Sequence, residues 1–234
     1  MDTPEYDAAF EQYPFPLSDF QKHAIRGIVE GKHVLITAHT GSGKTLPAEF
    51  SIRHFTGMGK KVVYTSPIKA LSNQKFHEFS EQFPDLSFGL LTGDIKTNPE
   101  ADVLIMTTEI LRNTLFQKQM KEENHEANVK LHFDMDIQNE LGCVVFDEIH
   151  YINDAERGKV WEETIMLLPN HIQMLMLSAT LDKEERFAAW IAGVKESDVW
   201  VAPTRTRVVP LKHYAYATLP QSSFKKETDK SLVT

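Results

Sequence analysis

The sequence is poor in cysteine and contains no long apolar run. Cys143 is its only cysteine, so no disulfide can form within the chain, and its apolar neighbours indicate a buried thiol. No stretch approaches the roughly 20 apolar residues that cross a bilayer, and residues 1–5 lack the basic start and apolar core of a secretion signal. We therefore expect a soluble protein of a reducing intracellular compartment, cytoplasmic or nuclear, without membrane contact.

The chain also has no excess of positive charge. Its 33 acidic residues outnumber 25 basic ones, which gives a formal net charge of −8. General attraction cannot hold a polyanion on such a chain, so any nucleic acid must be bound by local geometry. With 234 residues, 41% of them hydrophobic, and no internal repeat, the chain suits one large α/β domain with a full core.

The sequence does contain a glycine-rich loop at residues 38–45, directly after an apolar run that predicts a strand. Its letters, AHTGSGKT, match the phosphate-binding pattern G-x-x-x-x-G-K-[ST] at Gly43, Lys44 and Thr45, with Ala38 in place of the first glycine. Glycine lets backbone N–H groups converge on an anion, lysine adds charge for the outer phosphates, and the threonine hydroxyl suits Mg²⁺. A chance Gly-Ser turn is the alternative, but the order of strand, loop and helix favours a nucleotide site. The residues expected to surround the phosphates are Thr40, Gly41, Ser42, Gly43, Lys44 and Thr45.

A pair of carboxylates follows a second buried strand, predicted at 141–146. Asp147 stands at the tip of that strand, where burial without a partner is costly, so we expect it to face an open site. In a phosphate-loop fold this tip adjoins the loop, where Asp147 can hold Mg²⁺ and Glu148 can orient or deprotonate the attacking water. An ordinary acidic loop is the alternative, and the presence of Lys44 favours the catalytic interpretation.

Hydroxyl-bearing residues follow the other predicted strands. The strands at 61–65, 88–91 and 103–106 are followed by residues such as Ser66 and Thr107. Open α/β sheets bind ligands at the carboxyl ends of their strands, so these residues are candidates for a track along a nucleic-acid backbone. Helix capping explains the hydroxyl groups as well.

A helix is expected to begin at Ser18 or Asp19 and to end at Gly31, with Gln21 in its first turn. A glutamine amide offers a donor and an acceptor side by side, which suits the edge of adenine. An isolated helical glutamine usually faces solvent. The position of Gln21 just ahead of the phosphate-loop strand favours adenine recognition.

The remaining expectations concern segments without visible chemistry. Residues 1–16 are predicted to form an extended N-terminal arm packed on the domain, 117–128 a solvated loop, and 131–137 a half-buried edge strand. Residues 208–216 look extended, and 216–234 are expected to be a linker or the end of a fragment.

One further helix is predicted near the end of the domain. Asp182 and Glu185 have the spacing of a capping pair for a helix that continues through Trp190. Gly193 is the expected end of that helix.

In chain order, the motifs are FPLSDFQ at 15–21, AHTGSGKT at 38–45, SPIKALSNQ at 66–74, TGD at 92–94, TTEIL at 107–111, DEIH at 147–150 and SAT at 178–180. Together they resemble superfamily 2 helicases, and specifically the DExH-box RNA helicases of the Ski type that assist the RNA exosome. The resemblance implies a RecA-like P-loop NTPase domain at 17–215, with a largely parallel sheet and helices on both faces. It also implies ATP and Mg²⁺ as cofactors.

The resemblance assigns roles residue by residue. Phe15 would stack on adenine, and Gln21 would read its edge. The catalytic residues would be Lys44, Asp147, Glu148 and His150. The segment Ser178, Ala179 and Thr180 would couple the nucleotide state to the RNA, together with His150. The residues along the RNA track would be Pro67, Lys69, Ala70, Gly93, Thr107 and Thr108. Single-stranded RNA, a second RecA-like domain downstream and an RNA-decay complex are the partners that the resemblance implies.

The sequence departs from the family pattern at three places. The loop begins with Ala38, which is usual among such helicases, and Arg207-Val208-Val209-Pro210-Leu211 replaces an Arg-Pro-x-Pro-Leu segment. The second RecA-like domain, whose arginines complete the ATP site, is not part of this sequence. The chain therefore resembles a first lobe that is nearly inactive by itself.

Two other functions remain open. A non-catalytic nucleotide- or RNA-binding module would use the same fold, although intact Lys44, Asp147 and Glu148 disfavour a decayed site. One lobe of a DNA translocase would share the ATP site. The segment 66–74 disfavours that alternative only through the resemblance.

Overall fold

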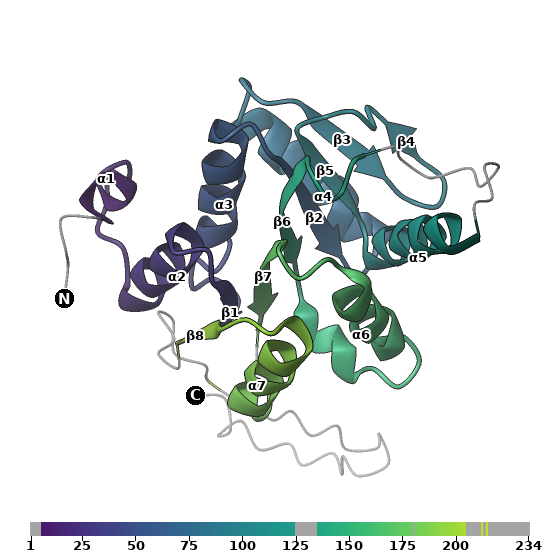
Figure 1. The fold of residues 1–234 in the computed structure, drawn as a ribbon. Helices are drawn as coiled ribbons and strands as arrows, with labels where there is room; N and C mark the ends of the chain where they lie inside the picture. The colour runs from purple at the N-terminus through teal and green to yellow at the C-terminus, as the bar shows by residue number, and fades with distance from the viewer. Residues whose placement is uncertain (1–5, 125–134, 180, 205–211, 213, 215–234) are drawn as a thin grey trace, which may run out of the picture.

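The computed structural model describes residues 6–124, 135–179, 181–204, 212 and 214 (Figure 1). In this part of the chain, eight strands form one sheet: β1 (His33–Thr37), β2 (Lys61–Ser66), β3 (Phe88–Leu91), β4 (Lys96–Thr97), β5 (Val103–Thr107), β6 (Leu141–Phe146), β7 (Gln173–Ser178) and β8 (Val199–Pro203). The helices are α1 (Asp7–Phe10), α2 (Asp19–Val29), α3 (Leu46–Gly57), α4 (Lys69–Gln82), α5 (Thr108–Asn124), α6 (Gly158–Leu167) and α7 (Glu184–Lys195). A 3₁₀ helix, η2 (Ile149–Asn153), follows β6.

The strands lie in the order β4-β3-β5-β2-β6-β7-β1-β8, and neighbours run parallel apart from the antiparallel pair β3 and β4. Strands β1, β3, β5 and β7 are buried along their whole length, as expected where helices cover both faces. Because the strands are parallel, their carboxyl ends meet at one edge of the sheet. The loops with the predicted chemistry follow β1, β2, β5, β6 and β7 at that edge.

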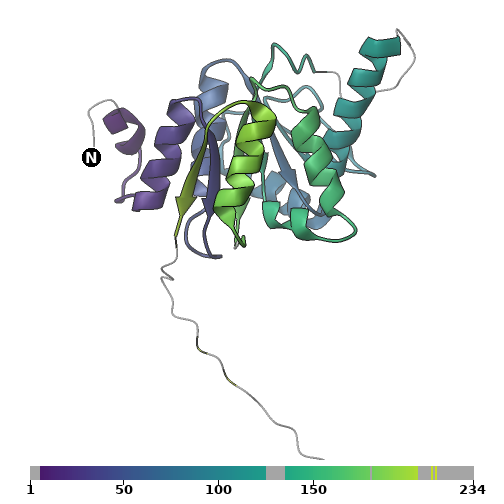
Figure 2. The same ribbon diagram turned by 60° about the horizontal axis from the view of Figure 1, so that its bottom comes forward.

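Helices lie on both faces of the sheet (Figures 1 and 2). Two apolar clusters fill the spaces between the sheet and these helices. One cluster joins the sheet to α2, α3 and α4 through residues such as Ile25, Ile52 and Phe79. The other joins the opposite side to α5, α6 and α7 through Leu111, Trp161 and Ile191. The predicted α/β fold with helices on both faces is therefore confirmed.

Four of the predicted strands and the first long helix are confirmed. The strands predicted at 61–65, 88–91, 103–106 and 141–146 each lie within one residue of β2, β3, β5 and β6. Cys143 on β6 is buried, and burial raises the pKa of its thiol. No helix in the described part of the chain has the length and apolarity needed to cross a membrane.

The predicted extended arm is helical at α1. The buried Tyr6 ring anchors this helix, because its hydroxyl donates to Glu30. The guanidinium of Arg26 lies 5.5 Å from the ring centroids of both Tyr6 and Phe10. Aromatic packing and cation–π contacts with α2 therefore stabilise a helical conformation of the arm that its proline-rich sequence does not predict.

The predicted surface loop at 117–128 is wrong for residues 117–124, which belong to α5. The polar sequence of this segment does not predict a helix, because α5 is stabilised by packing against α6 rather than by a strong apolar periodicity of its own. Residues 125–128 lie outside the described part of the chain. Met135 and Ile137 are buried as predicted, but 135–137 are not in a strand, and 131–134 are not described.

The predicted capping pair is also wrong. Lys183 precedes α7 with a φ of +57°, and no side chain caps the helix. Instead, Glu184 of the first turn accepts a hydrogen bond from Thr37 at the end of β1, a tertiary contact that spacing alone cannot predict. Gly193 lies inside α7, and the helix ends before Glu196, whose φ is +50°. Of the segment 208–216, only residues 212 and 214 are described.

Candidate functional site

The glycine-rich loop lies between β1 and α3, as the sequence predicts. The backbone N–H of Ala38 donates to the carbonyl oxygen of Ser178 on the neighbouring β7, at 2.9 Å, which fixes the start of the loop. The N–H and the hydroxyl of Ser42 both donate to the carbonyl oxygen of His39 and close a tight turn. Gly41 and Gly43 have φ values of +81° and +83°, which a residue with a side chain adopts only with strain.

Lys44 and Glu148 meet at the carboxyl edge of the sheet. The Lys44 ammonium donates to Oε1 of Glu148 at 2.9 Å, and the two side chains are only 10% and 24% exposed. Glu148 has a φ of +54°, a rarely occupied left-handed conformation for a non-glycine residue. The left-handed turn at Glu148 leads directly into η2, which begins at Ile149. The structure thus brings together the cation and the carboxylate that the sequence predicts to act on one nucleotide.

Asp147 is buried and has a partner, contrary to the open position expected from the sequence. The Tyr64 hydroxyl on β2 donates to its Oδ2 at 2.7 Å, and the Glu148 N–H donates to its Oδ1 at 3.0 Å. Burial raises the pKa of Asp147, an effect that the Tyr64 hydrogen bond opposes and the Glu148 charge reinforces. Tyr64 is a site residue that sequence analysis missed, because its position in β2 indicates only a core role.

The donor set suits a magnesium ion. Thr45 is the N-cap of α3 but makes no capping hydrogen bond with its side chain. Each carboxylate oxygen of Asp147 accepts one hydrogen bond and retains a further lone pair. The described residues contain no group of three His, Cys, Asp or Glu that could hold a metal, and Mg²⁺ characteristically uses only one or two carboxylates besides phosphates and waters. Thr45 and Asp147 therefore fit Mg²⁺ that arrives with a nucleotide.

One oxygen of Glu148 remains available for chemistry. Its Oε2 is buried and has no hydrogen-bond partner among the described residues. Nδ1 of His150 lies 3.3 Å away and is likewise without a hydrogen bond in the described part of the chain. A buried polar atom without a hydrogen bond calls for an explanation, and a catalytic role is one of those known.

Gln21 joins the first helix to the phosphate loop. Its Oε1 accepts from the N–H and the hydroxyl of Ser18, each at 2.9 Å, and its Nε2 donates to the carbonyl oxygen of Gly43 at 3.1 Å. One amide N–H then remains for a ligand. Phe15 is 50% exposed, and its ring lies 5.9 Å from that of Tyr13. The positions of Phe15 and Gln21 are compatible with the predicted adenine contacts, which stay predictions.

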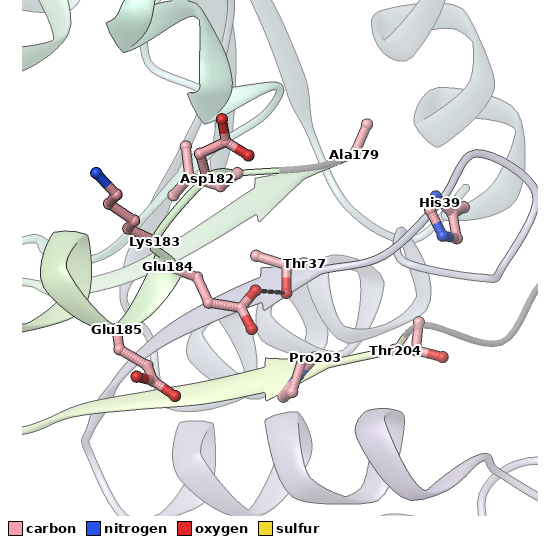
Figure 3. Close-up of a pocket in the computed structure, with 10 residues that line it drawn as sticks. Thr37, His39, Ala179, Asp182, Lys183, Glu184, Glu185, Pro203 and Thr204 are labelled. Carbon is pink, nitrogen blue, oxygen red and sulfur yellow. Dashed lines mark hydrogen bonds between the residues drawn. The ribbon is translucent and has the colours of Figure 1, made fainter.

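Ala179, from the predicted coupling segment, borders a cavity of about 380 Å³ at the carboxyl ends of β1 and β8. Figure 3 shows Thr37 in this cavity, with its hydroxyl donating to Glu184 at 2.5 Å, and His39 and Ala179 at its rim. Ser178 pairs in register with Thr37, and its hydroxyl is buried with no hydrogen bond to any described residue. Thr180 lies outside the described part of the chain.

A second hollow, which we call the groove, lies between the starts of α4, α5 and α6 and has a volume of about 540 Å³. Its lining residues are Pro67, Ile68, Lys69, Gly93, Thr107, Glu109, Ile110, Asn113 and Arg157. Four of the predicted track residues are thus brought together. Ala70 and Thr108 are not in the lining, and the Thr108 hydroxyl, buried at 1% exposure, donates to the carbonyl oxygen of Ser66 at 3.4 Å. Their assignment to the track stays a prediction.

The mostly parallel sheet, the loop before α3 and the acidic pair after β6 define an α/β domain of the P-loop nucleotide-binding class. Residues 18–187 match the DEAD/DEAH box helicase family, and the chain belongs to this family. It is 44% identical over 200 residues to the antiviral helicase SKI2 of Saccharomyces cerevisiae, covering 86% of this chain and 14% of the relative. It is 42% identical over 213 residues to the human exosome RNA helicase MTR4, covering 91% and 19%.

The family resemblance predicted from the motifs is thus confirmed, and these two relatives are much longer than this chain. A solved structure of the helicase MrfA bound to DNA has a TM-score of 0.64, with 16% identity over 86% of this chain and 29% of that one. At that identity the likeness shows the fold alone. The chain spans less than a fifth of the length of the SKI2 and MTR4 relatives.

Proposed function

We propose that this chain is the ATP-binding lobe of an ATP-dependent RNA helicase, which couples ATP hydrolysis to RNA unwinding with the help of a second RecA-like lobe. The observation that carries the proposal is the meeting of Lys44, Asp147 and Glu148 at one edge of the sheet. The relative MTR4 is an exosome RNA helicase, which supports RNA as the substrate and an RNA-decay complex as a partner.

In this proposal the loop at 38–45 binds the phosphates of ATP. An ammonium group has three donors, so Lys44 can reach a phosphate oxygen as well as Glu148. The start of α3 directs further backbone N–H groups and a positive partial charge to the same place. Thr45 and Asp147 would hold Mg²⁺, which neutralises charge on the phosphates when bound.

Glu148 is proposed to accept the proton of the attacking water. Lys44 holds its Oε1, which leaves the buried Oε2, without a hydrogen bond among the described residues, to act on the water. His150, beside that oxygen, and the segment at 178–180 are proposed to pass the nucleotide state on to the RNA track. The Ser178 carbonyl contact with the start of the phosphate loop supports this role.

The groove is proposed to hold single-stranded RNA. Its hydroxyl, amide and cationic side chains suit phosphates and sugars rather than particular bases. RNA binding should therefore be weak, salt-sensitive and nearly independent of sequence.

Two alternatives predict different results. A non-catalytic module would bind nucleotide or RNA without any hydrolysis, even when joined to a second lobe. A DNA translocase lobe would be stimulated by DNA. A longer protein containing this chain, assayed for ATPase activity with RNA and with DNA, separates the three functions.

The test of the proposal is the behaviour of residues 1–234 alone and joined to a second lobe. An arginine from outside the phosphate loop is worth roughly 10³–10⁵ in rate, so the chain alone should bind ATP but hardly hydrolyse it. It should also fail to displace an RNA duplex, because unwinding needs two lobes that move relative to one another. RNA-stimulated turnover of several per second by the chain alone, abolished by Glu148→Gln, would contradict the need for a second lobe.

A further inference from the structure

Arg157 lies in the groove although it belongs to none of the motifs found in the sequence. It is the residue just before α6, whereas the predicted track residues of the groove come from α4 and the loop before it, from β5 and from the loop after β3. The groove lining therefore includes two cations, Lys69 and Arg157, opposed by the single carboxylate of Glu109.

The charge of Lys69 is already compensated. Its ammonium forms an ion pair with Asp94, in the loop after β3. The Arg157 guanidinium, in contrast, has no ion pair within 4.0 Å among the described residues, although the nearby Asp154 acts on it electrostatically. Arg157 is thus the cation of the groove with the most capacity for an external anion.

The backbone that carries Arg157 is firmly held. Oδ1 of Asp154 accepts from the N–H groups of Glu156, at 3.0 Å, and of Arg157, at 2.9 Å. These hydrogen bonds lower the pKa of Asp154, so the carboxylate that makes them stays ionised. The Gly158 N–H donates to the carbonyl oxygen of Asp154 at 2.8 Å.

Gly158 also packs the turn against η2. A Cβ atom at this position would lie only 2.1 Å from the carbonyl oxygen of Ile152, so no larger residue fits without a shift of the backbone. The 3₁₀ helix η2 begins directly after Glu148. A short segment, 148–157, therefore connects the carboxylate beside Lys44 to the arginine in the groove.

We propose that Arg157 binds a phosphate of the RNA strand in the groove and that the segment 148–157 joins this contact to the ATP site. The inference rests on the proposed function and adds a residue to it. A guanidinium binds two oxygens of one phosphate with parallel N–H donors, which an ammonium cannot do. The Thr107 hydroxyl on β5 and the Asn113 amide on α5 also line the groove and provide neutral donors for an extended strand.

The experiment is a titration of residues 1–234 with a short fluorescein-labelled oligouridylate over a series of KCl concentrations, followed by anisotropy. Arg157→Ala should weaken binding roughly 5- to 20-fold, since hydrogen bonds to charged groups are the strong ones. It should reduce the slope of log K against log salt by about 0.7, the contribution of one phosphate contact on a single strand. Arg157→Lys should restore the slope but only part of the affinity.

Lys159→Ala is the matched control. Lys159 lies on the same helix with a side chain that is 79% exposed, pairs with Glu163 and does not line the groove. Lys159→Ala removes the same formal charge as Arg157→Ala. Because Lys159 does not line the groove, its removal should leave both the RNA affinity and the salt slope unchanged. ATP affinity, measured by calorimetry, should be equal in all four proteins, which shows that the variants are folded.

The outcomes separate this inference from the proposed function. If the unmodified chain does not bind RNA, the proposed function falls and the inference falls with it. If the unmodified chain binds RNA and Arg157→Ala binds with the same affinity and slope, the inference alone is overturned. Equal losses in Arg157→Ala and Lys159→Ala would also overturn it, because they would reflect general charge. Competition by polyglutamate as strong as by oligouridylate would assign the groove to an acidic peptide instead.

Discussion

The Lys44 ammonium and Oε1 of Glu148 lie 2.9 Å apart, although the two residues are separated by 104 positions in the sequence. Lys44 follows β1 and Glu148 follows β6, and only β7 lies between these strands in the sheet. The pair thus connects the phosphate loop with the acidic motif. Both groups are mostly buried, so removing one leaves the charge of the other poorly compensated.

Lys44→Ala should weaken binding of Mg·ATP by roughly 10- to 100-fold, the range expected from the loss of a charge-assisted hydrogen bond. The fold should persist, because Lys44 faces the loop and Glu148 rather than an apolar cluster. Calorimetric titration with ATP and Mg²⁺ measures the effect. Lys32→Ala is the control. Lys32 lies just before β1, at the end of the strand away from the phosphate loop, and pairs with Asp198. Equal ATP affinity in Lys44→Ala and the unmodified protein would contradict the phosphate assignment.

Glu148→Gln should separate binding from hydrolysis in a protein that also contains the second lobe. The amide keeps the shape of the side chain but cannot take a proton from water, so turnover should fall roughly 10²- to 10⁴-fold. Binding of Mg·ATP should change little. Asp147→Asn should instead reduce the Mg²⁺ dependence of binding, because Asp147 is the proposed ligand. Steady-state ATPase assays and calorimetry distinguish the two, and full turnover by Glu148→Gln would show that another group is the base.

Gly43→Ala should damage the nucleotide site through the backbone. The φ of Gly43 is +83°, and a Cβ there would lie 2.6 Å from Nε2 of Gln21. We expect a loss of about 1–3 kcal/mol in the free energy of unfolding, together with weaker ATP binding. Gly57→Ala is the control, because a Cβ at this position in the last turn of α3 would meet no other group within 4 Å. Urea unfolding of both variants provides the measurement, and equal stabilities would refute the argument.

His33 should make the protein less stable in acid. Burial lowers its pKa from 6.5 to about 4, with a smaller contribution from the Lys195 charge. Its Nδ1 accepts from the Met174 N–H at 3.1 Å, which requires the neutral ring. Between pH 6.5 and 4 the unfolded chain therefore binds the proton that the folded chain does not, and the free energy of unfolding falls as the pH falls.

The loss from His33 should reach about 3 kcal/mol at the acid end of that range. Urea unfolding of the protein and of His33→Asn, which keeps an acceptor but does not titrate, measures it. The exposed His77 supplies the control His77→Asn, in which the pH slope due to His33 should persist. An unchanged pH slope in His33→Asn would refute the prediction.

The sequence by itself determined the elements that depend on residues close together in the chain. Apolar runs located the strands, and the glycine pattern located the loop whose positive φ values the structure contains at Gly41 and Gly43. The type and order of residues from Lys44 to Glu148 predicted the chemistry, because phosphate and metal binding need particular side chains.

Tertiary structure decided which distant groups share a space. The Tyr64 hydroxyl is the partner of Asp147, Glu184 binds Thr37 rather than capping a helix, and Arg157 lines the same groove as Lys69. Tertiary structure also extended α5 through a polar stretch without a helical pattern of its own. These results depend on how parallel strands are ordered and helices packed, and side-chain contacts between distant segments leave no periodicity in the sequence from which to predict them.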